Sequence, residues 1–247
     1  MLGIQKIIPA SNALEVGKRI HELLEEHYRQ SAGMWCTPRG PHNDKYVEQE
    51  CQLMMARYKA QYPQEPFSVV DIEQKFELAI PGTNHVLSGR MDGVVRMHDT
   101  KKLWLLEHKS EGSPTRNKPE VWASKGQVGV YLWAGAQLYS EEFGGILLNV
   151  ITRSATSTAT GARFRRDSLI RTLQQQQEAI DNVVWAADQI EALEKSHGAG
   201  KLWPQDRNRC YDGWRQCPYY SLHVTGRTEE TLRDYEAIKR DDKKAAD

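Results

Sequence analysis

The chain has 247 residues, of which 39% are hydrophobic and 27% charged, and its formal net charge is zero because 33 Lys and Arg balance 33 Asp and Glu. This composition is typical of a soluble globular protein, and the length suffices for one sizeable core. No apolar run approaches the roughly 18 residues of a membrane helix, and residues 1–9 lack the long hydrophobic region of a signal peptide. We therefore expect a cytoplasmic protein with no membrane role.

The first predicted element is an amphipathic helix from Ala13 to Tyr28, in which apolar residues recur at helical spacing. It contains the pattern Gly17-x-x-x-His21-x-x-Leu24-Glu25. His21 and Glu25 lie one turn apart, so they share a face of the helix. Taken alone, this pattern leaves two interpretations open for His21: a functional residue, or an ordinary half-buried helix histidine.

Two β-strands are predicted further along, at Val86–Met97 and Leu103–Lys109, because both segments are rich in Val, Leu, Met and Trp. The polar residues 99–102 between them form the turn. If Asp99 lies opposite Lys102, paired positions sum to 201 throughout the hairpin. A register error of one residue would turn every side chain to the other face.

In that register Asp92 faces Lys109, and Glu107 projects from the same face because side chains alternate along a strand. Close carboxylates repel, so two of them beside a lysine indicate a bound cation. Mg²⁺ or Mn²⁺ suits such hard oxygen ligands. The ion would acidify and position a water for attack on a phosphodiester, while Lys109 stabilises the developing charge. The alternative is a turn or bulge at Asp92 and a solvent-facing ion pair between Glu107 and Lys109.

A second helix is predicted at Pro119–Tyr139, where Gln127 and Tyr131 are four residues apart and face the same way. An amide and a phenol are suited to holding phosphate oxygens and positioning a DNA backbone. The alternative is a surface glutamine and a core aromatic residue.

Four short motifs in this order along the chain resemble those of the RecB-type exonuclease branch of the PD-(D/E)xK nuclease superfamily, and the chain is similar to phage recombination exonucleases. The motifs are Gly17 to Glu25, Gly89-x-x-Asp92, Glu107-x-Lys109 and Gln127-x-x-x-Tyr131. The resemblance spans residues 14–138. It implies an α/β, restriction-endonuclease-like core with a central mixed β-sheet of four or five strands flanked by helices.

The same resemblance implies roles for individual residues. The implied catalytic residues are Asp92, Glu107, Lys109, Gln127 and Tyr131. The implied ligands of a Mg²⁺ or Mn²⁺ ion are His21, Asp92, Glu107 and the backbone carbonyl of His108. An imidazole nitrogen in this set favours tolerance of Mn²⁺.

Further strands are predicted at Ser68–Ile80 and Gly145–Thr152, and further helices at Lys45–Gln61 and Asp167–Lys195. An arginine-rich stretch follows the strand that ends at Thr152. It either binds DNA phosphates or forms a solvated loop beside a helix. The candidate DNA-binding residues are Arg163, Arg165, Arg166, Lys118 and Lys125.

Four cysteines raise the question of a second metal centre. Some relatives hold an iron–sulfur cluster with one cysteine before the nuclease motifs and three after them, and the segment around Cys210 and Cys217 resembles their tail. Here His223 stands where a further cysteine would be expected, and Cys36 and Cys51 both follow the first motif, so we do not expect a cluster. Cys210, Cys217 and His223 could bind zinc, although their spacing is irregular. Free thiols in a reducing cytoplasm are the expected state.

We expect one nuclease domain at residues 1–225 and a charged, disordered tail at residues 226–247. The expected function is a Mg²⁺- or Mn²⁺-dependent DNA exonuclease of recombination, repair or phage DNA processing, acting on linear double-stranded or single-stranded DNA. Beside DNA, the candidate partners are a single-strand annealing or other recombination protein and a second copy of the chain. Two alternatives stay open: an iron–sulfur nuclease of the CRISPR-adaptation type, and a non-catalytic DNA-binding subunit with the same fold.

Overall fold

The computed structural model describes residues 4–6, 12–111, 119–153, 163–197, 210–212, 215–226, 228–233 and 235–237. Its contacts divide the chain into two compact units. The larger is Ser11–Trp185, and the smaller combines Met1–Ala10 with Ala186–Asp247. The domain limits expected from the sequence, 1–225 and 226–247, stay a prediction.

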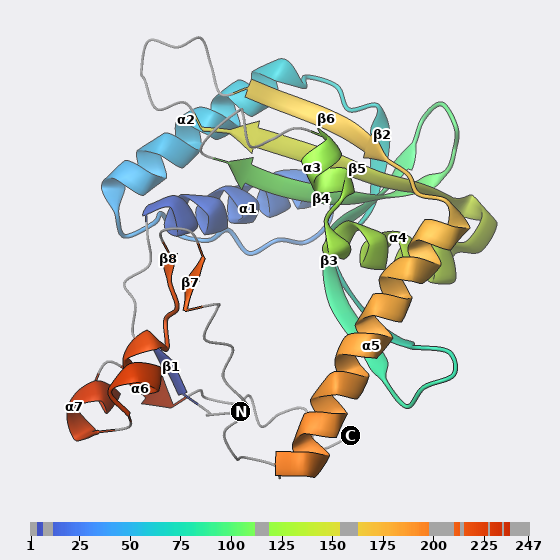
Figure 1. The fold of residues 1–247 in the computed structure, drawn as a ribbon. Coiled ribbons are helices and arrows are strands. Elements are labelled where there is room, and N and C mark those ends of the chain that lie inside the picture. The colour runs from blue at the N-terminus through green and yellow to red at the C-terminus, as the bar shows by residue number, and fades with distance from the viewer. Residues whose placement is uncertain are drawn as a thin grey trace. The chain divides into compact units, whose positions relative to one another are not determined.

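The larger unit is built around a five-stranded sheet (Figure 1). The strands, in spatial order, are β2 (Phe67–Ala79), β3 (Val86–Met97), β4 (Leu103–Glu111), β5 (Phe143–Thr152) and β6 (Arg163–Leu169). Strands β4 and β5 are parallel and the other neighbours are antiparallel. The predicted α/β fold with a central mixed sheet is confirmed.

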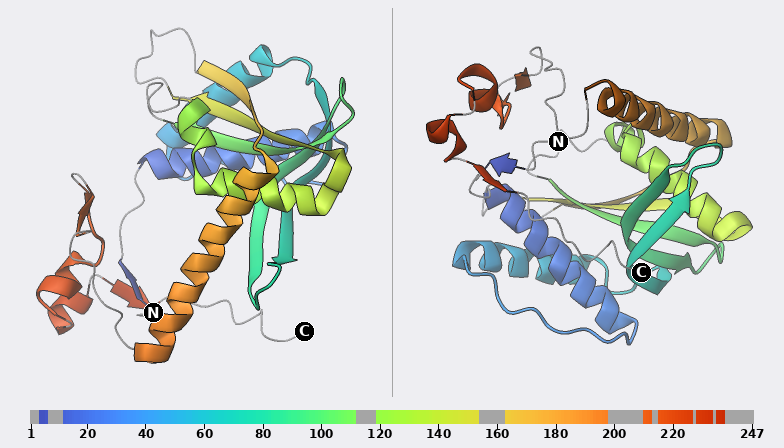
Figure 2. Two further views of the ribbon diagram at one scale, coloured as in Figure 1. Left: turned by 45° about the vertical axis from the view of Figure 1, so that its right-hand side comes forward. Right: turned by 90° about the horizontal axis from the view of Figure 1, so that it is seen from below.

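Helices cover both faces of this sheet (Figure 2). Helices α1 (Asn12–Ser31) and α2 (Lys45–Gln61) pack on one face, where their apolar residues join Leu106 of β4 in one buried cluster. On the other face, α4 (Gly126–Tyr139) and Ile180 of α5 (Leu173–His197) join Leu105 in a second cluster. Consecutive residues of β4 therefore serve opposite cores, as strand alternation requires.

Two predicted helices begin or end differently in the structure. The long helix expected from Asp167 starts only at Leu173, because residues 163–169 pair with β5 as edge strand β6. The helix expected at Pro119–Tyr139 is split into α3 (Pro119–Ala123) and α4. At the junction Lys125 has an extended backbone, and the Arg171 guanidinium donates to the carbonyls of Ala123 and Lys125.

The β3–β4 hairpin has a different register from the one predicted. Val94 pairs with Leu105, so paired positions sum to 199 rather than 201. The reason is a four-residue loop, residues 98–101, in which Lys101 adopts a left-handed φ of 60°. Because the error is two residues, each side chain stays on the predicted face of the sheet.

The smaller unit includes the end of α5, from Ala186 to His197, and several short elements. β1 (Ile4–Lys6) pairs with β9 (Tyr235–Ala237), and β7 (Tyr211–Asp212) pairs with β8 (Arg215–Gln216). Its described residues also form two short helices, α6 (Tyr220–Val224) and α7 (Glu229–Leu232). The disorder expected of residues 226–247 stays a prediction. Across the described parts of both units, none of the helices is long and apolar enough to span a membrane.

Alanine at two glycines of α4 should separate close packing from helix propensity. A Cβ at Gly129 would lie 2.3 Å from Arg171 Nη1 and 2.5 Å from Ala179 Cβ, whereas a Cβ at Gly126 meets nothing within 4 Å. Gly129→Ala should therefore lower the free energy of unfolding by about 1–3 kcal/mol. Gly126→Ala should leave it unchanged or raise it by up to about 1 kcal/mol. Urea unfolding measures both, and equal effects would contradict the close approach of α4 and α5.

Candidate active site

The candidate site lies where strands β3 and β4 diverge. Their ladder ends at Gly93 and Leu106, whereas β3 stays paired with β2 as far as Val86. Beyond that point the backbone N–H of His108 donates to Asp92 Oδ2 at 2.7 Å. This bond satisfies the amide of a buried residue. It also fixes the Asp92 carboxylate beside the segment of β4 that carries the other predicted catalytic residues.

Glu107 and Lys109 project together from β4, as predicted. Glu107 is only 6% exposed, and its Oε1 accepts hydrogen bonds from Lys109 Nζ and, at 3.1 Å, from Gln127 Nε2. Tyr131 donates to the backbone carbonyl of Arg90 at 2.9 Å, two residues before Asp92. Helix α4 therefore contacts both strands of the site, β4 through Gln127 and β3 through Tyr131. We call the diverging ends of β3 and β4, which carry Asp92, Glu107 and Lys109, the fork.

His21 reaches the fork from α1. Its Nδ1 lies 3.6 Å from Asp92 Oδ2, and its ring contacts the His108 ring edge-on, with centroids 6.0 Å apart. Burial lowers the pKa of His21, although the Asp92 carboxylate opposes this effect. Burial likewise lowers the pKa of His108 well below its usual range. Lowered pKa values keep imidazoles neutral, the form that can bind a metal.

The charge balance at Glu107 is unfavourable. Burial, and then repulsion from Asp92, raise the pKa of Glu107 to about 7, even though Lys109 and Gln127 lower it. One lysine therefore does not offset the two carboxylates. An additional positive charge would relieve this repulsion.

The predicted metal ligands are only partly assembled. Within the described ranges, no three His, Cys, Asp or Glu side chains form a group that could hold a metal ion. His21 and Asp92 are adjacent, but the Glu107 carboxylate is bonded to Lys109 and Gln127. The donor chemistry fits a divalent cation, because the nearby side chains offer an imidazole nitrogen and the oxygens of two carboxylates that repel each other. The ligand roles, including that of the His108 carbonyl, stay predictions.

Glu73 is a site residue that the sequence reasoning missed. It lies between Ile72 and Gln74, which pair with Gly93 and Met91, so it stands across from Asp92. Its φ of 57° is unusual for a residue with a side chain, and such outliers cluster at functional sites. The Glu73 carboxylate pairs with Arg90 at 2.8 Å, and burial raises the pKa of Glu73. An acidic residue inside a strand is the one sequence signal that could have revealed it.

A hollow of about 610 Å³ opens beside His21 and Asp92. It lies between the amino-terminal half of α1 and the β2–β3 hairpin. Its cationic lining residues are Lys18, Arg39 and Arg90, and its acidic ones are Glu22, Glu25, Glu73 and Asp92. Gly17 also lines it, and a Cβ there would lie 3.2 Å from Ser110 Oγ. The glycine of the first motif thus allows α1 to approach β4 closely.

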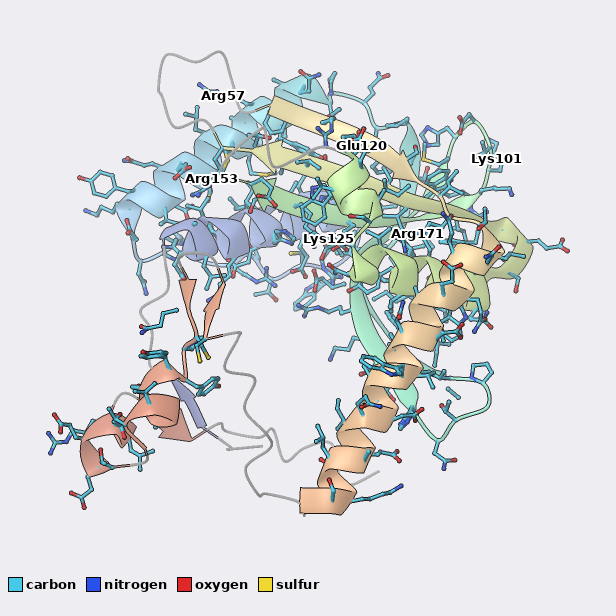
Figure 3. The ribbon with its side chains drawn as sticks, viewed as in Figure 1. Arg57, Lys101, Glu120, Lys125, Arg153 and Arg171 are labelled. Carbon is cyan, nitrogen blue, oxygen red and sulfur yellow. The ribbon has the colours of Figure 1, made fainter. Side chains whose placement is uncertain are left out.

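The predicted DNA-binding residues are not one surface. Arg166 forms an ion pair with Glu65 and its side chain is 10% exposed, and its role in DNA binding stays a prediction. Arg165 pairs with Asp167 at 2.7 Å. Lys125 is exposed at the start of α4, beside Arg171 (Figure 3). Lys118 and the side chain of Arg163 lie outside the described residues.

All four cysteines are free thiols, and Cys51 alone among them is buried, since Cys36, Cys210 and Cys217 are partly exposed. Cys51 is buried between α1 and α2, and burial raises the pKa of Cys51 to about 12, which makes it a structural thiol. Cys217 donates its backbone N–H to the carbonyl of Cys210 at 2.8 Å, so these two flank the β7–β8 hairpin. The side chain of His223 lies outside the described residues. The zinc and cluster alternatives therefore stay untested.

Comparisons with known proteins agree with this arrangement at the family level. The family model described as the PD-(D/E)XK nuclease superfamily matches residues 1–222. No curated protein matches the sequence significantly. Among solved structures, a "Putative exonuclease" from Eubacterium rectale is 16% identical, with a TM-score of 0.49 over 90% of this chain and 82% of that chain. The crystal structure of SSO0001 is 13% identical, with a TM-score of 0.33 over 72% of this chain and 78% of that one.

The raised pKa of Glu107 should appear in the pH dependence of stability. The folded protein keeps the Glu107 proton up to about pH 7, whereas an ordinary glutamate loses it near 4.5. The stabilisation is therefore complete below pH 4.5 and is lost as the pH rises through 7. We expect a loss on the order of 1–3 kcal/mol from this group in EDTA.

Denaturant unfolding between about pH 4.5 and 8 measures this effect. Glu107→Gln cannot titrate, so its stability should lack this part of the pH dependence. Glu120→Gln, at an exposed position of α3, should keep the wild-type profile. Identical profiles for wild type and Glu107→Gln would contradict the electrostatic description of the fork.

Proposed function

The chain belongs to the PD-(D/E)XK nuclease superfamily, and from that premise we propose that it is a divalent-metal-dependent deoxyribonuclease. The observation that carries the proposal is the fork itself. There the charge of Asp92 acts on Glu107, which pairs with Lys109, and His21 lies beside Asp92. A non-catalytic DNA-binding subunit would gain nothing from burying two repelling carboxylates beside a lysine and an imidazole.

The metal proposed for this site is Mg²⁺ or Mn²⁺, held by His21, Asp92, Glu107 and the His108 carbonyl. When bound, such an ion acts as a Lewis acid that stabilises negative charge on the phosphate. The protein's own groups supply the rest. Lys109 Nζ stabilises the charge that develops as water attacks phosphorus. Gln127 orients Glu107, and the His108 amide orients Asp92.

We propose that the DNA strand enters through the hollow beside His21. The cationic residues Lys18, Arg39 and Arg90 line this hollow, and their charges suit backbone phosphates. Each forms an ion pair with a glutamate: Glu15, Glu25 and Glu73, respectively. Exposed Lys125 on α4 is a further candidate phosphate contact. Electrostatic binding would therefore come from around the fork rather than from β6.

The RecB-type motifs at Gly17–Glu25 and Gln127–Tyr131 support exonucleolytic action. The proposed substrate is linear double-stranded or single-stranded DNA, in recombination, repair or phage DNA processing. The proposed location is the cytoplasm, and the proposed protein partner is a recombination protein such as a single-strand annealing protein. An exonuclease requires a free DNA end, so closed circular DNA distinguishes it from an endonuclease.

Replacement of Lys109 should affect turnover rather than binding. Lys109→Ala removes a cation whose interaction strengthens as phosphate is attacked, so kcat should fall on the order of 10²- to 10³-fold while DNA affinity stays close to wild type. Lys102→Ala, at an exposed position directly before β4, is the matched control and should keep wild-type kcat. End-labelled linear duplex, single-stranded and closed circular DNA, each with Mg²⁺ or Mn²⁺, are the substrates.

The wild type should degrade linear DNA, leave closed circles intact and lose activity in EDTA. Cleavage of circles would replace the exonuclease proposal with an endonuclease. Wild-type turnover by Lys109→Ala at saturating DNA would show that the observed cleavage comes from a contaminant or another site.

A further inference from the structure

A row of polar side chains crosses the sheet on the face opposite Glu107 and Lys109. His108, Asn149 and Arg166 are register partners on β4, β5 and β6. They point toward α1 and α2, and they are 3%, 0% and, for the arginine side chain, 10% exposed. Buried polar groups are costly unless they are hydrogen-bonded. The hydrogen bonds of these three side chains therefore decide whether the row can be stable.

The edge of the row is a partly buried ion pair between Arg166 and Glu65. Arg166 Nη1 and Nη2 contact the two carboxylate oxygens of Glu65 at 2.5 and 2.9 Å. Nη2 also donates to the hydroxyl of Tyr58 at 2.8 Å, and the guanidinium lies 3.6 Å from the ring centroid of Tyr62. This bidentate geometry fixes the Glu65 carboxylate as an acceptor.

Because Glu65 can only accept, the donor of each hydrogen bond between Glu65, Tyr28 and Tyr58 can be assigned. Tyr28 donates its hydroxyl proton to Glu65 Oε1 at 3.0 Å. The hydroxyls of Tyr28 and Tyr58 are 2.5 Å apart, so one proton must lie between them. Because the Tyr28 proton is already used, Tyr58 is the donor of that bond. The oxygen of Tyr58 is left to accept.

Asn149 connects the Tyr58 hydroxyl to the ring of His108. Asn149 Nδ2 donates to the Tyr58 oxygen at 3.0 Å and also lies 2.8 Å from His108 Nδ1. An amide nitrogen can only donate, so Nδ1 accepts and the ring proton resides on Nε2. The reversed amide would require a proton on Nδ1. In the observed orientation Asn149 Oδ1 is buried without a partner among the described residues, a cost of about 1–3 kcal/mol.

We propose that Asn149 and Tyr58, oriented by the Arg166–Glu65 pair, are positioning residues that hold His108 as its Nε2–H tautomer and thereby fix the fork. The ring of Tyr28 stacks on that of His108, with centroids 5.6 Å apart and planes at 12°. The backbone N–H of the same histidine holds Asp92. A ring clamped on one side of β4 thus sets the position of a carboxylate on the other.

The kinetic consequence rests on the proposed nuclease function. Residues that orient metal-site groups typically cost on the order of 10- to 100-fold in activity when they are replaced. Tyr58→Phe keeps the buried ring and removes the hydroxyl that links Asn149 to the ion pair. We expect kcat at saturating DNA to fall by about 10- to 100-fold while KM changes by less than about threefold.

Tyr139→Phe is the matched control. Its hydroxyl donates to Gln74 Oε1 at 2.6 Å, so the variant also loses a side-chain hydrogen bond, but away from His108. We expect Tyr139→Phe to keep kcat. Equal kcat for Tyr58→Phe, Tyr139→Phe and wild type would reduce the row to a purely structural role and overturn the proposal.

Nitrogen-15 NMR of the histidine rings provides a test that needs no enzymatic activity. In the wild type, His108 should show an unprotonated Nδ1 and a protonated Nε2, and Tyr58→Phe should show a mixture of tautomers while Tyr139→Phe does not. A protonated Nδ1 in the wild type would overturn the proposal. A wild type without nuclease activity would instead overturn the proposed function, while the ring shifts would still decide the tautomer.

Discussion

The hydrogen bond from the His108 backbone to Asp92 is the constraint on which the rest of the site depends. It forms where β3 leaves β4, so a side chain replaces the strand partner that the backbone would otherwise have. Asp92 is thereby held beside Glu107 even though the two strands have separated. Without this hydrogen bond, the charge of Asp92 would not be fixed next to Glu107 and His21. The repulsion from Asp92 that raises the pKa of Glu107 would then weaken.

Each side of the sheet contributes differently to this fork. On the α4 side, Gln127 and Lys109 contact Glu107, whose pKa is raised to about 7 because burial and Asp92 outweigh them. On the α1 and α2 side, hydrogen bonds and a bidentate ion pair link His108, Asn149 and Arg166, and Asn149 Oδ1 and Arg166 Nε are left without partners among the described residues. The face with Glu107 and Lys109 therefore carries the repulsion between carboxylates, whereas on the other face the one carboxylate of the row, Glu65, is paired with Arg166.

The sequence predicted the parts of the fold that depend on local patterns. Alternation placed Glu107 and Lys109 on one face, and it survived a hairpin register that was wrong by two residues. Strand β6 was missed because an edge strand can carry charged residues such as Arg165 and Asp167 and so lacks an apolar pattern. The ion pair of Arg166 could not be read from the sequence, since its partner Glu65 is a hundred and one residues away. Glu73 was missed because its role depends on backbone conformation.

The central claim is that the fork at Asp92 and Glu107 holds a divalent cation. Anomalous diffraction from crystals soaked in Mn²⁺ tests it most directly, because the metal itself is located. We expect one strong peak contacted by His21, Asp92 and Glu107, with the Glu107 carboxylate turned away from Lys109 toward the ion. Absence of a peak at saturating Mn²⁺, or a peak bound only by other residues, would contradict the metal site and the mechanism built on it.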